Sequence, residues 1–245
     1  MNSSTTTSPH LIKVRNKNTI VIHWFNALCW LILIASGFGI ISGDWVRLAP
    51  AVWPEFLQGL LGGNHQVVWL HAIVGLAWIS VLVLFILVNL TSVVIPFLRQ
   101  VLVLTPIAAL KDTWSMVITL AHLFGLMKSI PVPPQGRYNG AQRLLGTMII
   151  FCSLLIMVTG LYLFFSPKLL PFSENMLYGT IFRWALVAHA SAVFLVIIGL
   201  IAHIYFAIIE EPECLEAMKS GQIEVDFIKH HNTLWYQQLK QEGKV

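Results

Sequence analysis

The chain has 245 residues, of which 57% are hydrophobic and 11% are charged, and its formal net charge at pH 7 is +4. Soluble domains usually contain about 25% charged residues, so this composition excludes an ordinary soluble protein. It predicts an integral membrane protein with a single domain of a few long helices, for which no nucleic-acid partner is expected.

The N-terminus and the cysteines carry no targeting or metal-binding motif. We expect the polar segment 1–19 to be disordered and cytoplasmic, and it lacks the short apolar core and cleavage site of a signal peptide. The three cysteines, Cys29, Cys152 and Cys214, form neither a CxxC nor a CxxCH motif. This spacing predicts neither a thiolate zinc site nor covalently attached c-type haem.

Four segments reach the roughly 20 apolar residues that a helix needs to cross a bilayer. In chain order they cover residues 20–41, 67–95, 144–165 and 182–209. A fifth apolar stretch, 113–127, is shorter and ends before the helix-breaking sequence "PVPP", so we expect an interfacial or re-entrant helix there. The predicted fold is an all-α membrane protein with a four-helix transmembrane bundle over residues 20–209.

The distribution of lysine and arginine predicts the orientation of the bundle. These residues are concentrated before the first span, between the second and third spans, and after the fourth span. The other two loops contain only Arg47, Lys168 and Arg183. Because cytoplasmic loops carry the excess of positive residues, we expect both termini in the cytoplasm.

The segment 210–245 is more charged than the spans, and we expect it to form a cytoplasmic tail. Near its end, Trp235 and Tyr236 predict a short amphipathic helix that lies on the membrane or docks a partner subunit. His230 and His231 lie outside the predicted spans, and adjacent helical residues point in different directions. We expect them to make polar contacts rather than to bind a cofactor.

Four of the nine histidines lie inside the predicted spans, at positions 23, 71, 189 and 203. An ionisable group in lipid usually faces the bundle interior, so each is a candidate functional residue, although a single histidine can also serve packing. His189 and His203 are separated by 14 positions. On a helix this is a rise of about 21 Å and a rotation of about four turns less 40°, so both lie on one face at two depths.

The depth of each histidine predicts two pairs. His23 opens the first span at the cytoplasmic side, whereas His71 opens the second span at the outer side. Depth matching therefore pairs His23 with His203, and His71 with His189. Two neutral imidazoles from facing helices suit the iron of a six-coordinate b-type haem, whereas structural zinc requires four ligands at one depth. The pattern predicts two haems. Small residues that would leave room for them are Gly37, fourteen residues after His23, Gly75, four after His71, and Gly199, four before His203. Small residues in membrane helices also serve close helix packing.

The sequence "GRYNGAQRLLG" precedes the third span and contains two amide side chains. Asn139 and Gln142 are three positions apart, so at a helix start they project to neighbouring positions, where they could bind a quinone. Asn139 could equally cap the helix, and Gln142 and Arg143 could anchor it at the interface. The residues alone leave both readings open.

Five stretches resemble one known family. In order they are "VIHWFNALCWLILIASGF", "WLHAIVGLAW", "GRYNGAQRLLG", "VAHASAVFLVIIGLIAHIYFAI" and "KHHNTLWYQQL". They resemble the gamma subunit of respiratory formate dehydrogenase, a dihaem b-type cytochrome, over nearly all of residues 20–239. The resemblance implies that His71 and His189 hold the outer haem and that His23 and His203 hold the cytoplasmic haem.

The same resemblance implies an electron-transfer subunit of the bacterial inner membrane rather than an independent enzyme. Electrons would come from an iron–sulfur subunit, with a separate catalytic subunit, and reach menaquinone or ubiquinone near Asn139 and Gln142. Two features depart from the family: a long apolar loop over 98–134, and the acidic sequence "EEPEC". The alternatives are the cytochrome of a membrane-bound hydrogenase or thiosulfate reductase, and a haem-free membrane anchor or transporter.

Overall fold

The computed structural model describes residues 10–43, 47, 49–169 and 176–245. The described chain is mainly helical, and it divides into two compact units. The first unit combines Met1–Ile20, Thr91–Ile150 and Ile197–Val245, and the second combines Val21–Leu90 and Phe151–Val196.

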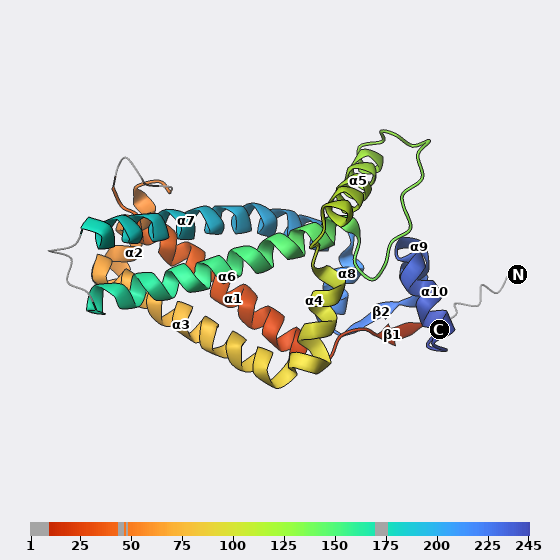
Figure 1. The fold of residues 1–245 in the computed structure, drawn as a ribbon, viewed down its shortest axis with the longest axis horizontal. Coiled ribbons are helices and arrows are strands. Elements are labelled where there is room, and N and C mark those ends of the chain that lie inside the picture. Colours follow the sequence, from red (N-terminus) through yellow and green to blue (C-terminus); the bar gives the residue numbers. More distant parts are fainter. Residues whose placement is uncertain (1–9, 44–46, 48, 170–175) are drawn as a thin grey trace, which may run out of the picture. The chain divides into compact units, whose positions relative to one another are not determined.

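Four long helices correspond to the four predicted spans. They are α1 (Lys17–Ile40), α3 (Asn64–Asn89), α6 (Gly140–Leu169) and α7 (Met176–Tyr205) (Figure 1). After α3 the chain continues through a π-helical segment into α4 (Ile95–Val101). The four helical segments that contain α1, α3, α6 and α7 are each long and apolar enough to cross a membrane. This confirms the prediction of a mainly helical chain with four membrane-spanning segments.

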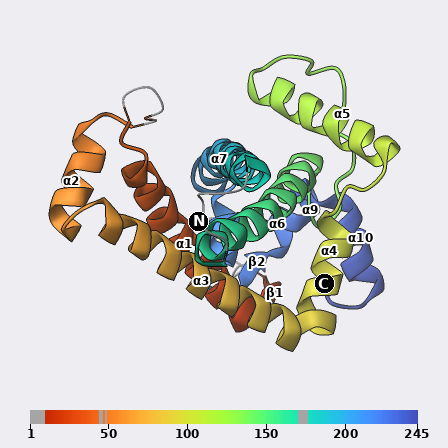
Figure 2. The ribbon, with the colours of Figure 1, turned by 60° about the vertical axis from the view of Figure 1, so that its left-hand side comes forward.

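In the second unit, the included parts of α1, α3, α6 and α7 lie side by side (Figures 1 and 2). Trp78 on α3 donates a hydrogen bond from its indole Nε1 to Oδ1 of Asn26 on α1, over 2.7 Å. Many large apolar side chains on these helices face outward, and Leu87 is 69% exposed. Helices that are apolar on all sides are typical of chains surrounded by lipid.

A short helix, α2 (Val52–Leu61), lies in the loop between the first two spans and is missing from the sequence prediction. Gln58 on α2 donates a hydrogen bond from Nε2 to the Gly39 carbonyl near the end of α1, over 3.2 Å. A side chain at Gly39 would lie 2.6 Å from Leu57, so the two helices approach closely because this residue is glycine. The helix ends at Gly62, which adopts a positive φ of 91°.

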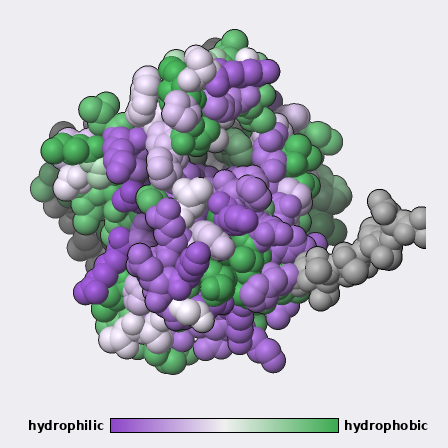
Figure 3. Space-filling view, turned by 90° about the vertical axis from the view of Figure 1, so that its right-hand side faces the viewer, coloured by the Kyte–Doolittle hydropathy of each residue, from purple (hydrophilic) through white to green (hydrophobic). Residues whose placement is uncertain are grey.

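The first unit contains the only two strands among the described residues, and they join segments from opposite ends of the chain. β1 (Leu11–Lys13) pairs with β2 (Gln222–Glu224) in an antiparallel ladder. After the strand come α9 (Val225–His231) and α10 (Thr233–Gln241), and α8 (Pro212–Ala217) precedes it. The face on the side of α9 and α10 is mainly hydrophilic (Figure 3).

The C-terminal segment folds more extensively than an isolated amphipathic helix would. Its small core contains Ala217, Ile223, Ile228 and Leu239. The backbone N–H of Leu234 donates to the Gln135 carbonyl over 3.0 Å, which ties the tail to the loop before α6. The sequence predicts a helix around Trp235, and the structure adds a strand and two further helices before it.

The N-terminal segment also carries more structure than its polar composition predicts. Residues 11–13, within the segment expected to be disordered, form β1, whereas residues 1–9 lie outside the described residues. Asn16 accepts a hydrogen bond from the Thr19 N–H over 2.7 Å, which caps the start of α1. A three-residue strand is too short to show an alternating apolar pattern in the sequence. The residues that pair with β1 lie near the other end of the chain.

The helix between the second and third spans begins earlier than predicted. α5 (Pro106–Leu123) starts after Thr105, whose side chain accepts a hydrogen bond from the Ala108 N–H over 3.2 Å. Pro106 occupies the first helical position, where its missing N–H costs nothing. The expected start at residue 113 follows the charged pair Lys111 and Asp112, but a charged pair does not end a helix. The location of α5 at the membrane surface stays a prediction.

Candidate functional site

Two of the predicted histidines, His71 on α3 and His189 on α7, face each other inside the second unit. Their ring centres are 6.4 Å apart, and their planes are inclined by 66°. The structure therefore brings together the two residues that the sequence analysis assigns to the outer level.

The distance between these rings can be compared with the requirement of a shared metal ion. An imidazole nitrogen binds a metal at about 2.0–2.1 Å. With about 1.2 Å from that nitrogen to its ring centre, two imidazoles that bound one metal ion from opposite sides would have centres about 6.5 Å apart. The observed 6.4 Å is close to this spacing, so the separation of the two rings is compatible with one iron bound by both.

A buried serine contacts the first of these rings. The Ser36 side chain on α1 is only 2% exposed, and its Oγ lies 2.9 Å from Nδ1 of His71. The same hydroxyl donates a hydrogen bond to the Ile32 carbonyl, one helical turn earlier, over 2.7 Å.

A threonine on α6 repeats this arrangement at the second ring. Thr159 donates from Oγ1 to the Leu155 carbonyl over 2.6 Å, and the same oxygen lies 3.0 Å from Nδ1 of His189. Thr159 is 7% exposed, so water competes little for this contact.

The two hydroxyl groups favour a proton on Nδ1 of each ring. Each hydroxyl has one hydrogen, which it donates to the carbonyl one helical turn earlier. The hydroxyl oxygen then accepts a hydrogen bond from the imidazole Nδ1–H. In this tautomer, Nε2 of His71 and Nε2 of His189 keep their lone pairs, which is the form that binds a metal.

A glycine follows each hydroxyl residue and lies beside the same ring. A Cβ atom at Gly37 would lie 3.5 Å from Cε1 of His71, and one at Gly160 would lie 3.3 Å from Cε1 of His189. The dipeptides Ser36–Gly37 and Thr159–Gly160 therefore contact the two histidines in equivalent ways. We call these two dipeptides the hydroxyl–glycine seats.

The two hydroxyl residues are not among the residues that the sequence patterns predict for the site. The available signal was the repeat itself, because the first and third spans each contain a hydroxyl residue followed by glycine. Of the other small residues in the spans, Gly199 lies in the first unit, where a Cβ atom would come within 2.6 Å of Met148. Gly199 therefore serves close packing of α7 against α6.

The other two membrane histidines belong to different units. His23 lies on α1 in the second unit, where its ring meets the Trp24 ring edge-on with centres 5.3 Å apart. His203 lies on α7 in the first unit, on the same continuous helix as His189. The pairing of His23 with His203 stays a prediction.

Asn139 and Gln142 form a reciprocal capping box at the start of α6. The Gln142 N–H donates to Asn139 Oδ1 over 2.8 Å, and the Asn139 N–H donates to Gln142 Oε1 over 3.1 Å. Gln142 also donates from Nε2 to the Glu211 carboxylate over 3.2 Å. These contacts support the capping interpretation of both residues, and a quinone role stays a prediction.

The chain also matches a known family. The model of the family described as prokaryotic cytochrome b561 matches residues 14–221, which include all four membrane histidines and both hydroxyl–glycine seats. No curated protein gave a significant match. The family match covers most of the chain, and four of its helices can cross a membrane. The chain is therefore a member of the prokaryotic cytochrome b561 family, a multi-pass bacterial membrane protein and a b-type cytochrome.

Proposed function

We propose that this cytochrome is the membrane-anchoring dihaem subunit of a respiratory dehydrogenase complex. We assign that complex as formate dehydrogenase. It passes electrons from a partner iron–sulfur subunit through two haems to menaquinone or ubiquinone near the cytoplasmic side. The facing pair of His71 and His189, each with Nδ1 bonded to a hydroxyl, is the observation that carries the proposal.

The outer haem is assigned to His71 and His189, whose Nε2 atoms would bind its iron. A bound b-type haem supplies reversible one-electron chemistry, which no side chain of this site provides. Ser36 and Thr159 hold the rings in the required tautomer, and the hydrogen bonds that they accept make the Nε2 atoms stronger electron donors.

The second haem is assigned to His23 and His203. Support comes from α7, which is one helix over Met176–Tyr205 and so carries both His189 and His203. Fourteen helical positions separate them, so they share a face about 21 Å apart along the axis. His23 precedes the other ligands in sequence and is the remaining histidine at the cytoplasmic level of the predicted bundle.

The quinone is assigned to the region of Asn139 and Gln142. The capping box uses the side-chain oxygens of both residues, and Gln142 Nε2 donates to Glu211. The amide NH₂ group of Asn139 is not required for the cap, and it can donate to a quinone oxygen. We therefore assign direct quinone contact to Asn139 and a positioning role to Gln142.

The orientation and partner assignments rest on the sequence. The excess of lysine and arginine before α1, between α3 and α6 and after α7 supports cytoplasmic termini. The donor is held by a separate subunit, so a hydrogenase or a thiosulfate reductase remains the second candidate complex. Adding formate, hydrogen or a reduced sulfur compound to native membranes separates these partners: reduction of the b-type haems by formate alone is expected.

The number and location of the haems can be tested on the purified full chain. We expect b-type bands in a reduced-minus-oxidised spectrum and two haems per chain. His71→Ala and His203→Ala should each remove one haem, whereas the control His230→Ala, at an exposed residue outside the spans, should keep both. Absence of b-type bands would favour the haem-free anchor or transporter, in which the histidines relay protons or pack.

The same two variants also test the pairing of His71 with His189 and of His23 with His203. If His71→Ala or His203→Ala removes both haems while the helical circular-dichroism signal is unchanged, the two sites are not independent and the pairing is wrong. Loss of neither haem would also contradict it.

A further inference from the structure

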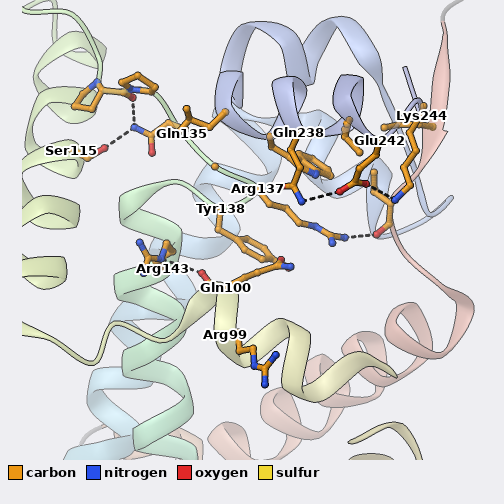
Figure 4. A pocket seen from close by; sticks show the side chains of 18 of the residues that line it. Arg99, Gln100, Ser115, Gln135, Arg137, Tyr138, Arg143, Gln238, Glu242 and Lys244 are labelled. Atoms are coloured by element: carbon orange, nitrogen blue, oxygen red, sulfur yellow. Dashed lines mark hydrogen bonds and ion pairs between the residues drawn. The ribbon is translucent and has the colours of Figure 1, made fainter. Parts of the chain in front are cut away.

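The first unit contains a large polar cavity outside the histidine site. Its volume is about 1100 Å³, and its lining comes from β1, the end of α4, α5, the loop before α6, the first turn of α6, and α10 (Figure 4). All of these segments belong to one unit.

Positive side chains dominate the lining of this cavity. The lysines and arginines are Lys13, Arg99, Lys111, Arg137, Arg143 and Lys244. The two carboxylates of the lining already have partners, because Arg143 pairs with Asp112 over 2.9 Å and Lys244 pairs with Glu242 over 2.6 Å. Among the described residues, no carboxylate pairs with the other four cations.

Arg137 is the most constrained of these cations. Its Nη2 donates to the Val14 carbonyl over 2.7 Å, and its guanidinium lies over the Trp235 ring, 5.2 Å from the centre. Within the described part of the chain, its buried Nε has no hydrogen-bond partner. Burial and the nearby charge of Arg15 lower the pKa of Arg137, which indicates positive charge that lacks compensation.

The cavity lies at the ends of two consecutive spans. Arg99 is near the end of the span Asn64–Val101, and Arg143 is in the first turn of the span Gly140–Pro167. The end of one span and the start of the next lie at the same membrane surface if no crossing separates them. The phosphate groups of lipids lie at this level.

An apolar stripe on α5 adjoins the cavity. Ile107, Leu110, Trp114 and Val117 follow helical spacing and are 82%, 74%, 52% and 41% exposed. On the adjoining face of the same helix, Asp112 and Ser115 are buried and line the cavity. A polar cavity beside an exposed apolar stripe matches the headgroup and acyl chains of a lipid.

We propose that this cavity binds the phosphate group of an anionic phospholipid, whose acyl chains lie along the exposed stripe of α5. Arg99 and Lys111 contact the phosphate, and the charge of Arg137 contributes to the attraction. The proposal requires only that the protein spans a membrane, so it is independent of the electron-transfer partner.

The test is native mass spectrometry of the delipidated full chain titrated with phosphatidylglycerol, phosphatidylcholine or inorganic phosphate. We expect one phosphatidylglycerol to bind much more tightly than phosphatidylcholine. The double variant Arg99→Gln/Lys111→Gln should weaken binding about 30-fold, since each basic residue near an anionic lipid contributes about 1 kcal/mol. The charge-preserving Arg99→Lys/Lys111→Arg variant and the control Lys229→Gln should bind as the wild type does.

Three outcomes would overturn the proposal. Equal affinity for the two lipids would show that anionic charge is not recognised. Unchanged binding in Arg99→Gln/Lys111→Gln would place the lipid elsewhere. Displacement of phosphatidylglycerol by millimolar inorganic phosphate would assign the cavity to a soluble anion instead.

Discussion

Thr159 accepts a hydrogen bond from His189 through an oxygen that lies 3.0 Å from the imidazole Nδ1. Ser36 repeats this relationship with His71 at 2.9 Å. The two contacts come from the first and third spans and act on histidines of the second and fourth. The ligand rings of the proposed outer haem are thus held by the two helices that carry no ligand to that haem.

Removing the threonine hydroxyl should change the redox potential of the outer haem. Thr159→Val keeps the shape but loses the acceptor for Nδ1–H, so His189 becomes a weaker electron donor and the oxidised iron is less stabilised. We expect the midpoint potential to rise by roughly 20–60 mV, the equivalent of one hydrogen bond for a one-electron couple. Ser36→Ala should act in the same direction, measured by spectroelectrochemical titration.

The matched control for this experiment is Thr119→Val on α5. Thr119 makes the same kind of hydrogen bond to the carbonyl four residues earlier, over 2.9 Å, and it lies on α5 rather than on the helices that carry His71 and His189. Its variant should leave both potentials unchanged. Equal shifts in the two threonine variants would indicate a general effect of the substitution.

Gly160 should tolerate a side chain less well than Gly37. A Cβ atom at Gly160 would lie 3.3 Å from the His189 ring, closer than an ordinary contact, whereas one at Gly37 would lie 3.5 Å from the His71 ring. We expect Gly160→Ala to displace the ring and lower the haem content of the purified chain. Gly179→Ala is the control, because a Cβ atom there meets no atom within 4 Å. Equal haem-to-protein ratios in Gly160→Ala, Gly37→Ala and Gly179→Ala would contradict the close contact between residue 160 and the His189 ring.

Asn139 can be tested for its two roles separately. Asn139→Ala removes the cap and should reduce stability by about 1 kcal/mol, seen as a lower thermal midpoint. Asn139→Asp keeps an oxygen for the cap but loses the NH₂ donor, so stability should be retained. If this NH₂ group contacts the quinone, Asn139→Asp slows quinone reduction with both haems intact; unchanged turnover would leave only the capping role.

Cys214 should be chemically inert at neutral pH. Burial and the adjacent Glu211 carboxylate raise the pKa of its thiol to about 12. The reactive thiolate predominates only above that pKa, so at pH 8 its fraction is about 10⁻⁴ and rises about tenfold per pH unit. Iodoacetamide labelling followed by mass spectrometry should modify Cys214 only in the denatured chain. Rapid labelling of the folded protein at pH 8 would contradict this assignment.

The spans were predictable because their signal is local and strong. Each contains a long apolar run with few charges inside it, so four membrane segments follow from the sequence. The pairing of His71 with His189 was also predictable, because the position of a residue along a membrane helix gives its depth in the bilayer. These two histidines were predicted at the same depth. The same reasoning pairs His23 with His203, and this pairing stays a proposal.

The hydrogen bonds around the site were harder to predict from the sequence. Ser36 and Thr159 are ordinary residues for a membrane helix, and only the rotation of each helix shows which hydroxyl meets which imidazole. The sequence left Asn139 between capping and quinone binding, and hydrogen-bond partners were needed to describe the cap. The pairing of β1 with β2 joins the two ends of the chain, and no local pattern encodes that partnership.

This pairing has a topological consequence. β1 precedes the first span and β2 follows the fourth, and strands can form a ladder only within one aqueous compartment. The chain must therefore cross the bilayer an even number of times between Lys13 and Gln222. Four crossings satisfy this parity and a fifth through α5 would break it, so reporters fused to the two termini should always respond on the same side of the membrane.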